Sequence, residues 1–326
     1  MATNQGNIEV NRGAYVVGPL TVYRDTKING IGRLSGSTKG ATTLSFVLGS
    51  NEDAFTYSGN TFPEGGFELS NLSVSNRKRS PSKPSDILTS NNRGIWAVDE
   101  SPSHNWNASE PWQQPKNGGN NCPKMKISNV IFERFTWAWD VHTWMTSFED
   151  VEFRYCGGTR TYGTSVTFRR VWPQHNLYEA YQTNLQYSSM DACSLGEQKS
   201  PGDLKSNGIA CYGGDIQVSN TGWENTYMGV VYRCVSGRID VVNPKHVTDK
   251  TIKANYEYEI GSADAVITVA GFTKTRDTDG DITDASYNHA LFYGPEGVEN
   301  LRFLTAITEE NLPYRYPHGD LSLIHI

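Results

Sequence analysis

The stretch Ile127-Ser128-Asn129-Val130-Ile131-Phe132 returns with the same order of apolar and polar residues, except at its fifth position, as Phe148-Glu149-Asp150-Val151-Glu152-Phe153. The shared pattern is an apolar residue, two polar or turn-forming residues, an apolar residue, any residue and an apolar residue. From Ile127 the next copies start 21, 20 and 19 residues apart. A period near twenty on β-forming residues is typical of a solenoid whose turns stack. All seven copies begin at Leu69, Ile127, Phe148, Phe168, Tyr187, Val218 and Val298.

In such a solenoid, residues one period apart lie about 4.8 Å apart, one above the other. The apolar positions of each copy are therefore predicted to point into the core. Asn71, Asn129, Asn220 and Asn300 share the third position, with Asp150 in place of Asn. Since Asn and Asp tolerate the left-handed backbone conformation, these residues are predicted to make the tight bend between two sheets.

The pattern predicts an all-β chain that forms a single-stranded, right-handed parallel β-helix with long loop insertions. One β-helix domain is expected over residues 1–305, followed by a partial C-terminal segment over residues 306–320. Residues 321–326 read like the translation of a sequencing-library adapter, so we expect them to be foreign to the fold. Within the domain we expect N-terminal rungs at 10–48, loops at 77–93 and 101–123, regular rungs at 124–242 and irregular rungs at 243–305.

Composition restricts the function classes. The 326 residues carry a formal net charge of −6, which argues against nucleic acid as a partner. No apolar run approaches the roughly 20 residues of a membrane helix, so no membrane insertion is expected. The start, residues 1–6, is polar and does not resemble a signal peptide. The five cysteines form no C-x-x-C pair, which favours buried free thiols over a disulfide.

No cofactor or metal is expected. Gly30-Ile31-Gly32 lacks the rest of a nucleotide-binding motif and is better explained as a solenoid turn. Residues 277–284 resemble part of a calcium loop but lack its terminal Glu, so a solvated turn is the preferred interpretation. His142 has no partner at ligand spacing.

The chain resembles the pectate-lyase-like superfamily and, within it, bacteriophage tailspikes. The segment Tyr15–Val22 through Ile28–Arg33 is similar to the first rungs of those β-helices, and the repeated apolar-Ser-Asn-apolar motif is similar to later rungs. The resemblance implies a parallel β-helix, commonly a homotrimer, that binds and often cleaves a surface polysaccharide. The superfamily has no single catalytic motif, so no active-site residue is carried over by match.

Aligning the copies places Ile131, Glu152, Trp172 and Asp191 in one outward column. Glu152 and Asp191 would then lie two rungs apart, about 9–10 Å between backbones. Two carboxylates at such a distance, with room for water, suit inverting glycoside hydrolysis, and the Trp172 face suits a sugar ring. The alternative is a solvated outer face with ordinary charge scatter.

Two neighbouring columns pair opposite charges, with Glu149 under Arg169 and Asp150 under Arg170. Ion pairs between rungs would help to hold the stack. Alternatively, the two arginines could bind the carboxylate of an acidic sugar.

A second candidate face is rich in aromatic residues. Trp137, Trp139, Asp140, His142 and Trp144 lie within eight residues, and the matching stretch holds Tyr178, Glu179 and Tyr181. Aromatic rings interleaved with acids are typical of a carbohydrate groove, although some of these rings could instead lie at a subunit interface.

Three functions remain open. The first is a glycoside hydrolase acting on capsule or O-antigen, with Glu152 and Asp191, then Asp140 and Glu179, as catalytic carboxylates, and Trp172, Arg169, Arg170, Trp137, Trp139, His142 and Tyr181 as substrate contacts. The second is a polysaccharide lyase that uses Arg169 and Arg170, or a bound calcium ion, to neutralise the carboxylate of a uronate. The third is a tail fibre or adhesin that binds glycan without cleaving it. The expected location is a virion tail, with a secreted bacterial protein as the alternative.

Overall fold

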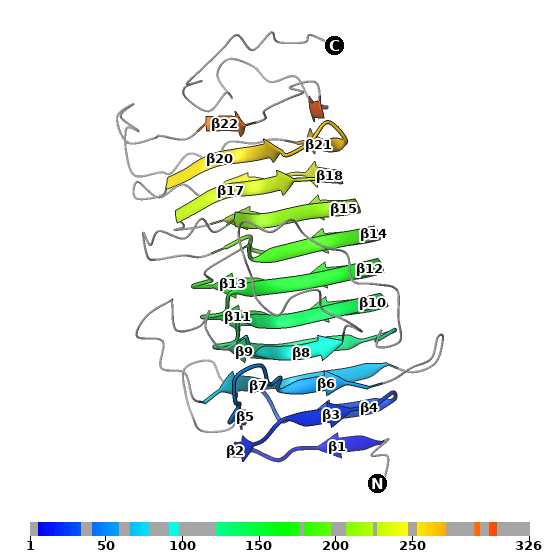
Figure 1. The fold of residues 1–326 in the computed structure, drawn as a ribbon, viewed down its shortest axis with the longest axis vertical. Coiled ribbons are helices and arrows are strands. Elements are labelled where there is room, and N and C mark those ends of the chain that lie inside the picture. The colour runs from blue at the N-terminus through cyan, green and yellow to red at the C-terminus, as the bar shows by residue number, and fades with distance from the viewer. Residues whose placement is uncertain are drawn as a thin grey trace.

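The computed structural model describes residues 6–33, 41–58, 66–77, 91–97, 122–176, 179–196, 207–223, 227–246, 253–271, 290–293 and 300–304. Within these residues nearly all regular structure is β-strand and every named strand pair is parallel. The strands rise rung by rung from β1 (Asn7–Glu9) to β22 (Ala290–Tyr293) along one long axis (Figure 1). The chain is therefore a right-handed parallel β-helix, as predicted.

Three parallel sheets run along this axis. The first sheet contains β3 (Leu20–Val22), β6 (Phe55–Tyr57), β8 (Arg93–Ala97), the N-terminal parts of β10 (Trp137–Glu149), β12 (Gly158–Arg169), β14 (Tyr181–Asp191) and β15 (Asn207–Ser219), then β17 (Tyr227–Cys234), β20 (Lys253–Ile260) and β22.

The second sheet contains β1, β4 (Thr26–Asn29), the N-terminal parts of β7 (Phe67–Asn76) and β9 (Lys126–Glu133), the C-terminal parts of β10, β12, β14 and β15, then β18 (Gly237–Val242), β21 (Ala265–Ala270) and β23 (Leu301–Phe303). The third face is made of β2 (Gly13–Val17), β5 (Thr42–Phe46), the C-terminal parts of β7 and β9, β11 (Glu152–Arg154), β13 (Trp172–Gln174), β16 (Gly222–Trp223) and β19 (Lys245–His246).

The register of the second sheet corrects two rung starts. Phe168 pairs with Met190, not with Tyr187, so this rung is three residues longer than the sequence pattern indicated. Tyr187 occupies an earlier bend, at φ 50°, in the same row as Met145 and Ser165. The error arose because Tyr187-Ser188-Ser189-Met190 imitates the first four residues of the pattern. Val298 was also wrong as a rung start, since Phe303 is the residue that pairs with Val269.

The predicted Asn bend is confirmed. Asn71, Asn129, Asp150 and Asn220 have φ values of 58°, 53°, 55° and 51°. Between rungs the amides also bond to each other, since the Nδ2 of Asn129 donates to the Oδ1 of Asn71 at 2.8 Å. Asn300 was a wrong assignment: it is absent from this left-handed row, and its Nδ2 donates to the Ala263 carbonyl.

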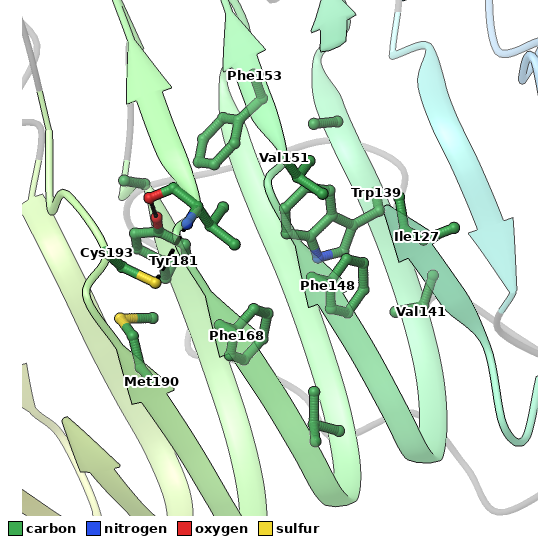
Figure 2. Packing of buried hydrophobic residues seen from close by; sticks show 14 of the residues in the cluster. Ile127, Trp139, Val141, Phe148, Val151, Phe153, Phe168, Tyr181, Met190 and Cys193 are labelled. Atoms are coloured by element: carbon green, nitrogen blue, oxygen red, sulfur yellow. Dashed lines mark hydrogen bonds between the residues drawn. The ribbon is translucent and has the colours of Figure 1, made fainter. Parts of the chain in front are cut away.

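Apolar side chains of successive rungs stack inside the three sheets (Figure 2). The predicted core residues Ile127, Val130, Phe132, Phe148, Val151 and Phe153 are all fully buried. The rings of Phe148 and Phe168 are parallel, with centroids 5.2 Å apart. Burying such a side chain contributes about 1.5–3 kcal/mol. The five cysteines are free and buried in this part of the chain, as predicted.

Most of the two predicted loops lies outside the described residues. The first loop ends earlier than predicted, because Arg93 already begins β8. The possible calcium loop at 277–284, the segments 306–320 and 321–326, and Tyr178 also lie outside the described residues.

Candidate functional site

The structure separates the predicted Glu152–Asp191 pair. Glu152 of β11 pairs in register with Ile131 and Trp172, so three members of the predicted column are confirmed. Asp191 instead pairs with Arg169, on the second sheet and before the bend. Ser194 takes the place expected for Asp191, since its amide donates to Val171 just as the amide of Trp172 donates to Val151. The assignment of Asp191 to this column was wrong because the extra three residues of the rung shift the register.

Glu149, Asp150, Arg169 and Arg170 form an ion-paired row along the bend between the second and third sheets. Arg170 Nε donates to Asp150 Oδ1 at 2.6 Å, and Arg169 Nη1 lies 3.6 Å from Glu149 Oε1. Hydrogen bonds from Arg170 lower the pKa of the Asp150 carboxyl. The predicted pairing between rungs is therefore confirmed, and it occupies both arginines.

Asp191 completes this row. Asn220 Nδ2 and Ser219 Oγ each donate to its Oδ1 at 2.9 Å, and together they lower its pKa. The Asp191 carboxylate is thus held in its ionised form by the next rung, and Arg169 of the preceding rung adds to this effect.

Glu152 is fixed by two arginines. Its Oε1 lies 3.0 Å from Arg33 Nη1, and its Oε2 accepts from Arg154 Nε at 2.9 Å. Only 12% of the Glu152 side chain is exposed, whereas Trp172 directly above it is 46% exposed. Because both oxygens of Glu152 are already bonded to arginines, this carboxylate is poorly suited to transfer a proton. The exposed Trp172 beside it is better suited to contact a ligand.

The aromatic face at the first sheet holds a buried charged cluster, which we call the first-sheet cluster: Asp53, Arg93, Trp137, Asp140, Arg160, Glu179, Tyr212 and Arg233. Asp140 pairs in register with Arg160 of the next rung, and Arg160 Nη1 lies 3.8 Å from Asp140 Oδ2. The guanidinium of Arg160 also stands 4.0 Å from the centre of the Trp137 ring. Asp140 is 1% exposed and its carboxylate oxygens accept no hydrogen bond from a described residue.

Asp53 and Arg93 belong to this cluster but were missed by the sequence analysis. Arg93 Nε lies 3.5 Å from Asp53 Oδ1, and both side chains are buried. Burial raises the pKa of Asp53 to about 6, although Arg93 opposes this shift, and the nearby Asp140 adds to it. No motif marks these residues, because each lies in a rung of irregular length.

Glu179 anchors the other end of the first-sheet cluster. The hydroxyl of Tyr212 contacts its two carboxylate oxygens at 2.9 and 2.8 Å, and Arg233 Nη1 lies 3.2 Å from Oε1. Arg233 also pairs with Glu259 at 3.2 Å. Arg233 is one-third exposed, so this end of the cluster reaches solvent, whereas Glu179 itself is 3% exposed.

Two predicted substrate contacts are core residues instead. Trp139 stacks on Phe148 with centroids 4.5 Å apart, and Tyr181 lies beside Phe153 and Phe168 inside the helix (Figure 2). The hydroxyl of Tyr181 donates to the carbonyls of Val171 and Ser194. Both assignments were wrong, because inward and outward side chains alternate along a strand and aromatic density alone does not tell them apart. His142 is half-buried, which lowers the pKa of its imidazole.

The described residues hold no group of three or more His, Cys, Asp or Glu side chains arranged to bind a metal ion. They also include no helix long and apolar enough to cross a membrane.

No protein-family profile matches the sequence, and no curated protein is significantly similar to it. Solved structures are similar in fold. The gp42 tailspike of Acinetobacter phage vb_AbaP_AS12 aligns with a TM-score of 0.53 and 10% identity over 95% of this chain and 62% of that one. ORF18 of Geobacillus virus E2 aligns at 0.45 and 10% identity over 89% of this chain and 52% of its own length.

The A-module of the Azotobacter vinelandii mannuronan C-5 epimerase AlgE4 aligns at 0.44 and 12% identity over 92% of this chain and 89% of that one. The chain thus spans about half of ORF18 and under two thirds of gp42. At these identities the comparison concerns the fold alone, and that fold is the parallel β-helix of the gp42 tailspike.

Proposed function

We propose that the protein is a tailspike-like protein of a virion tail that binds and cleaves a bacterial surface polysaccharide. The observation that carries this proposal is the alignment of 95% of the chain with a phage tailspike at a TM-score of 0.53. The wide outer faces of the β-helix, which carry aromatic and charged side chains, are consistent with an extended glycan ligand.

For the cleavage step we propose glycoside hydrolysis by carboxylates of the first-sheet cluster, Asp140 and Glu179. Asp53 supports this choice, because burial raises the pKa of its carboxyl to about 6, so a fraction of the molecules still carries this proton near neutral pH and can donate it to a leaving oxygen. Glu179 is linked by Tyr212 and Arg233 to the exposed end of the cluster.

The test is the release of reducing ends from a panel of capsule and O-antigen polysaccharides. Asp140→Asn and Glu179→Gln are each expected to lower the rate by about 10²–10⁴-fold, the usual contribution of a positioned acid or base. Asp191→Asn is the matched control, since this carboxylate lies in the bend row away from the first-sheet cluster, and it should keep the wild-type rate. Full activity in folded Asp140→Asn and Glu179→Gln would remove the assignment. Ultraviolet absorbance of an unsaturated product would identify a lyase instead.

A second candidate function is glycan binding without cleavage. It is favoured by the arginine ion pairs of Asp140, Glu149, Asp150, Glu152 and Glu179, which give each carboxylate a structural role. Retention of a polysaccharide that keeps its chain length over long incubation would support this function.

We also propose a homotrimer. Met145 and Tyr187 are strongly exposed in the same bend row, which is a suitable place for a subunit contact. Light scattering that finds only monomer over a wide concentration range would contradict this assembly.

A further inference from the structure

The outer surface of the third face carries a compact group of side chains on a different sheet from the first-sheet cluster. Four outward residues of two adjacent rungs form a square: Glu152 pairs with Trp172, and Arg154 pairs with Gln174. The residues between them, Phe153 and Pro173, are buried on the inner side of the strands. We call Glu152, Arg154, Trp172 and Gln174 the third-face patch.

The patch is ordered by its own contacts. Arg33 and Arg154 both bind the Glu152 carboxylate, and Arg33 also donates to the carbonyl of Asp150 at 3.1 Å. At one side the rings of Tyr155 and His175 stack with centroids 4.8 Å apart and an interplanar angle of 14°. Both residues have a left-handed backbone, with φ of 52° and 53°. The polar groups are therefore fixed before any ligand arrives, which reduces the entropy cost of binding.

Trp172 is the unusual member of the patch. A half-exposed indole on a solvent-facing strand leaves a large apolar surface in water, and such a surface commonly marks a binding site. Within about 7 Å along the strand lies the Gln174 amide, and one rung away lie a carboxylate and a guanidinium. An apolar ring face bordered by planar hydrogen-bonding groups matches a pyranose, which has one apolar C–H face and a rim of hydroxyls.

The charges indicate what kind of sugar fits. The Glu152 carboxylate lies between Arg33 and Arg154, so one anion is shared by two guanidinium cations. Both arginines that border the patch already have Glu152 as a carboxylate partner, so a strongly anionic ligand would compete with Glu152 for them. A neutral sugar needs only hydrogen bonds to the groups already in place.

We propose that the third-face patch is an accessory binding site for a neutral pyranose unit of the polysaccharide, with Trp172 as the stacking platform. The patch binds the polysaccharide at a point away from the bond that is cleaved, and it takes no part in the cleavage itself. The choice of a glycan as ligand rests on the proposed function, whereas the position and geometry of the site do not.

The test measures polysaccharide affinity by affinity electrophoresis and cleavage by reducing-end release, in the full chain. Trp172→Ala is expected to weaken binding to the polymer by about three- to tenfold, as expected for the loss of one aromatic contact. The cleavage rate at saturating polymer should stay unchanged. Trp172→Phe keeps a ring and should retain most of the affinity. Tyr15→Ala, which removes a 37% exposed ring from β2, several rungs away, is the matched control and should bind as wild type.

The outcomes distinguish this inference from the proposed function. Unchanged affinity in Trp172→Ala, while wild type binds and cleaves, overturns the accessory site and leaves the function standing. Weakened binding in a protein that never cleaves supports the site and removes the hydrolase assignment. A Trp172→Ala protein that changes oligomeric state but not affinity assigns the indole to a subunit contact and overturns the site. If wild type binds no polysaccharide of the panel, both proposals fail.

Discussion

The role of a single residue in this molecule depends on whether its side chain points into the core or out of it. Trp139 and Trp137 are two residues apart and both are buried, yet Trp139 packs in the core while Trp137 meets Arg160 in the first-sheet cluster. The β10 strand has a register irregularity between Trp137 and Asp140, which breaks the simple alternation. The aromatic cluster is visible in the sequence, but its inward and outward members cannot be told apart there, because a one-residue irregularity exchanges the two faces of the strand.

Asp53 gives a pH-dependent stability. Its folded-state pKa of about 6 lies above the unfolded value of 3.8, so the folded protein holds the proton more tightly. This stabilisation is fully present below pH 3.8 and is lost as the pH rises through about 6. In Asp53→Asn the loss is absent, so the unfolding free energy of the variant relative to wild type should rise by about 2–3 kcal/mol between pH 4 and pH 7.

Denaturant unfolding of both proteins across this pH range measures the difference. Other acids such as Asp150 and Asp191 titrate in both proteins and cancel in the comparison. A difference that does not change with pH would show that the fold does not raise the pKa of Asp53 above its unfolded value.

At the level of elements, the left-handed bend explains why the repeat could be recognised in the sequence. Asn71, Asn129 and Asn220 mark the bend in the sequence because few other residues accept this backbone conformation. The same row also contains Arg170 and Ala192, with φ of 51° and 52°; the repeat placed Arg170 above Asp150 but did not place Ala192 in the row. The fold was thus predictable from the rungs with Asn, whereas the register of β14 was lost in the rung that carries Ala192.

This row gives a matched pair of substitutions. Asn129→Ala should destabilise the protein by about 1–2 kcal/mol, since it introduces a strained Ala and removes the bond to Asn71. Ala192→Asn should stabilise by about 1 kcal/mol, because it relieves the same strain at an exposed position. Chemical denaturation of the two variants measures both effects. Equal destabilisation by both would mean that backbone strain at the bend is not what Asn relieves.

On the scale of the whole molecule, the core is one continuous stack in which the five cysteines are spaced along the axis. Burial raises the pKa of Cys156 and Cys193 to about 12, and Cys122 shifts in the same direction for the same reason. Cys211 and Cys234 pair in register on adjacent rungs.

The candidate site was less predictable at this scale than the core, because the first-sheet cluster joins Asp53 to Arg233 across rungs of unequal length.

The native protein is therefore expected to resist thiol reagents. Alkylation with iodoacetamide at pH 8 should label none of the five cysteines over minutes, and all five after unfolding, because burial keeps the reagent out. In Cys122, Cys156 and Cys193 the raised pKa also keeps the thiolate rare. Mass spectrometry of the labelled peptides checks each position. Rapid labelling of Cys211 or Cys234 alone would reveal local opening of those rungs, and rapid labelling of all five would contradict a closed core.

The pairing of Phe148 with Phe168 makes a turn of this helix an interchangeable unit. Removal of residues 149–168 would join Phe148 to Arg169, so that every later column still meets its predecessor in phase. Removal of half as many residues would leave this turn too short to bring its strands into register with both neighbouring rungs. A β-helix of this kind can therefore gain or lose whole turns. Its outer surface then becomes longer or shorter, while the core packing within each turn stays the same.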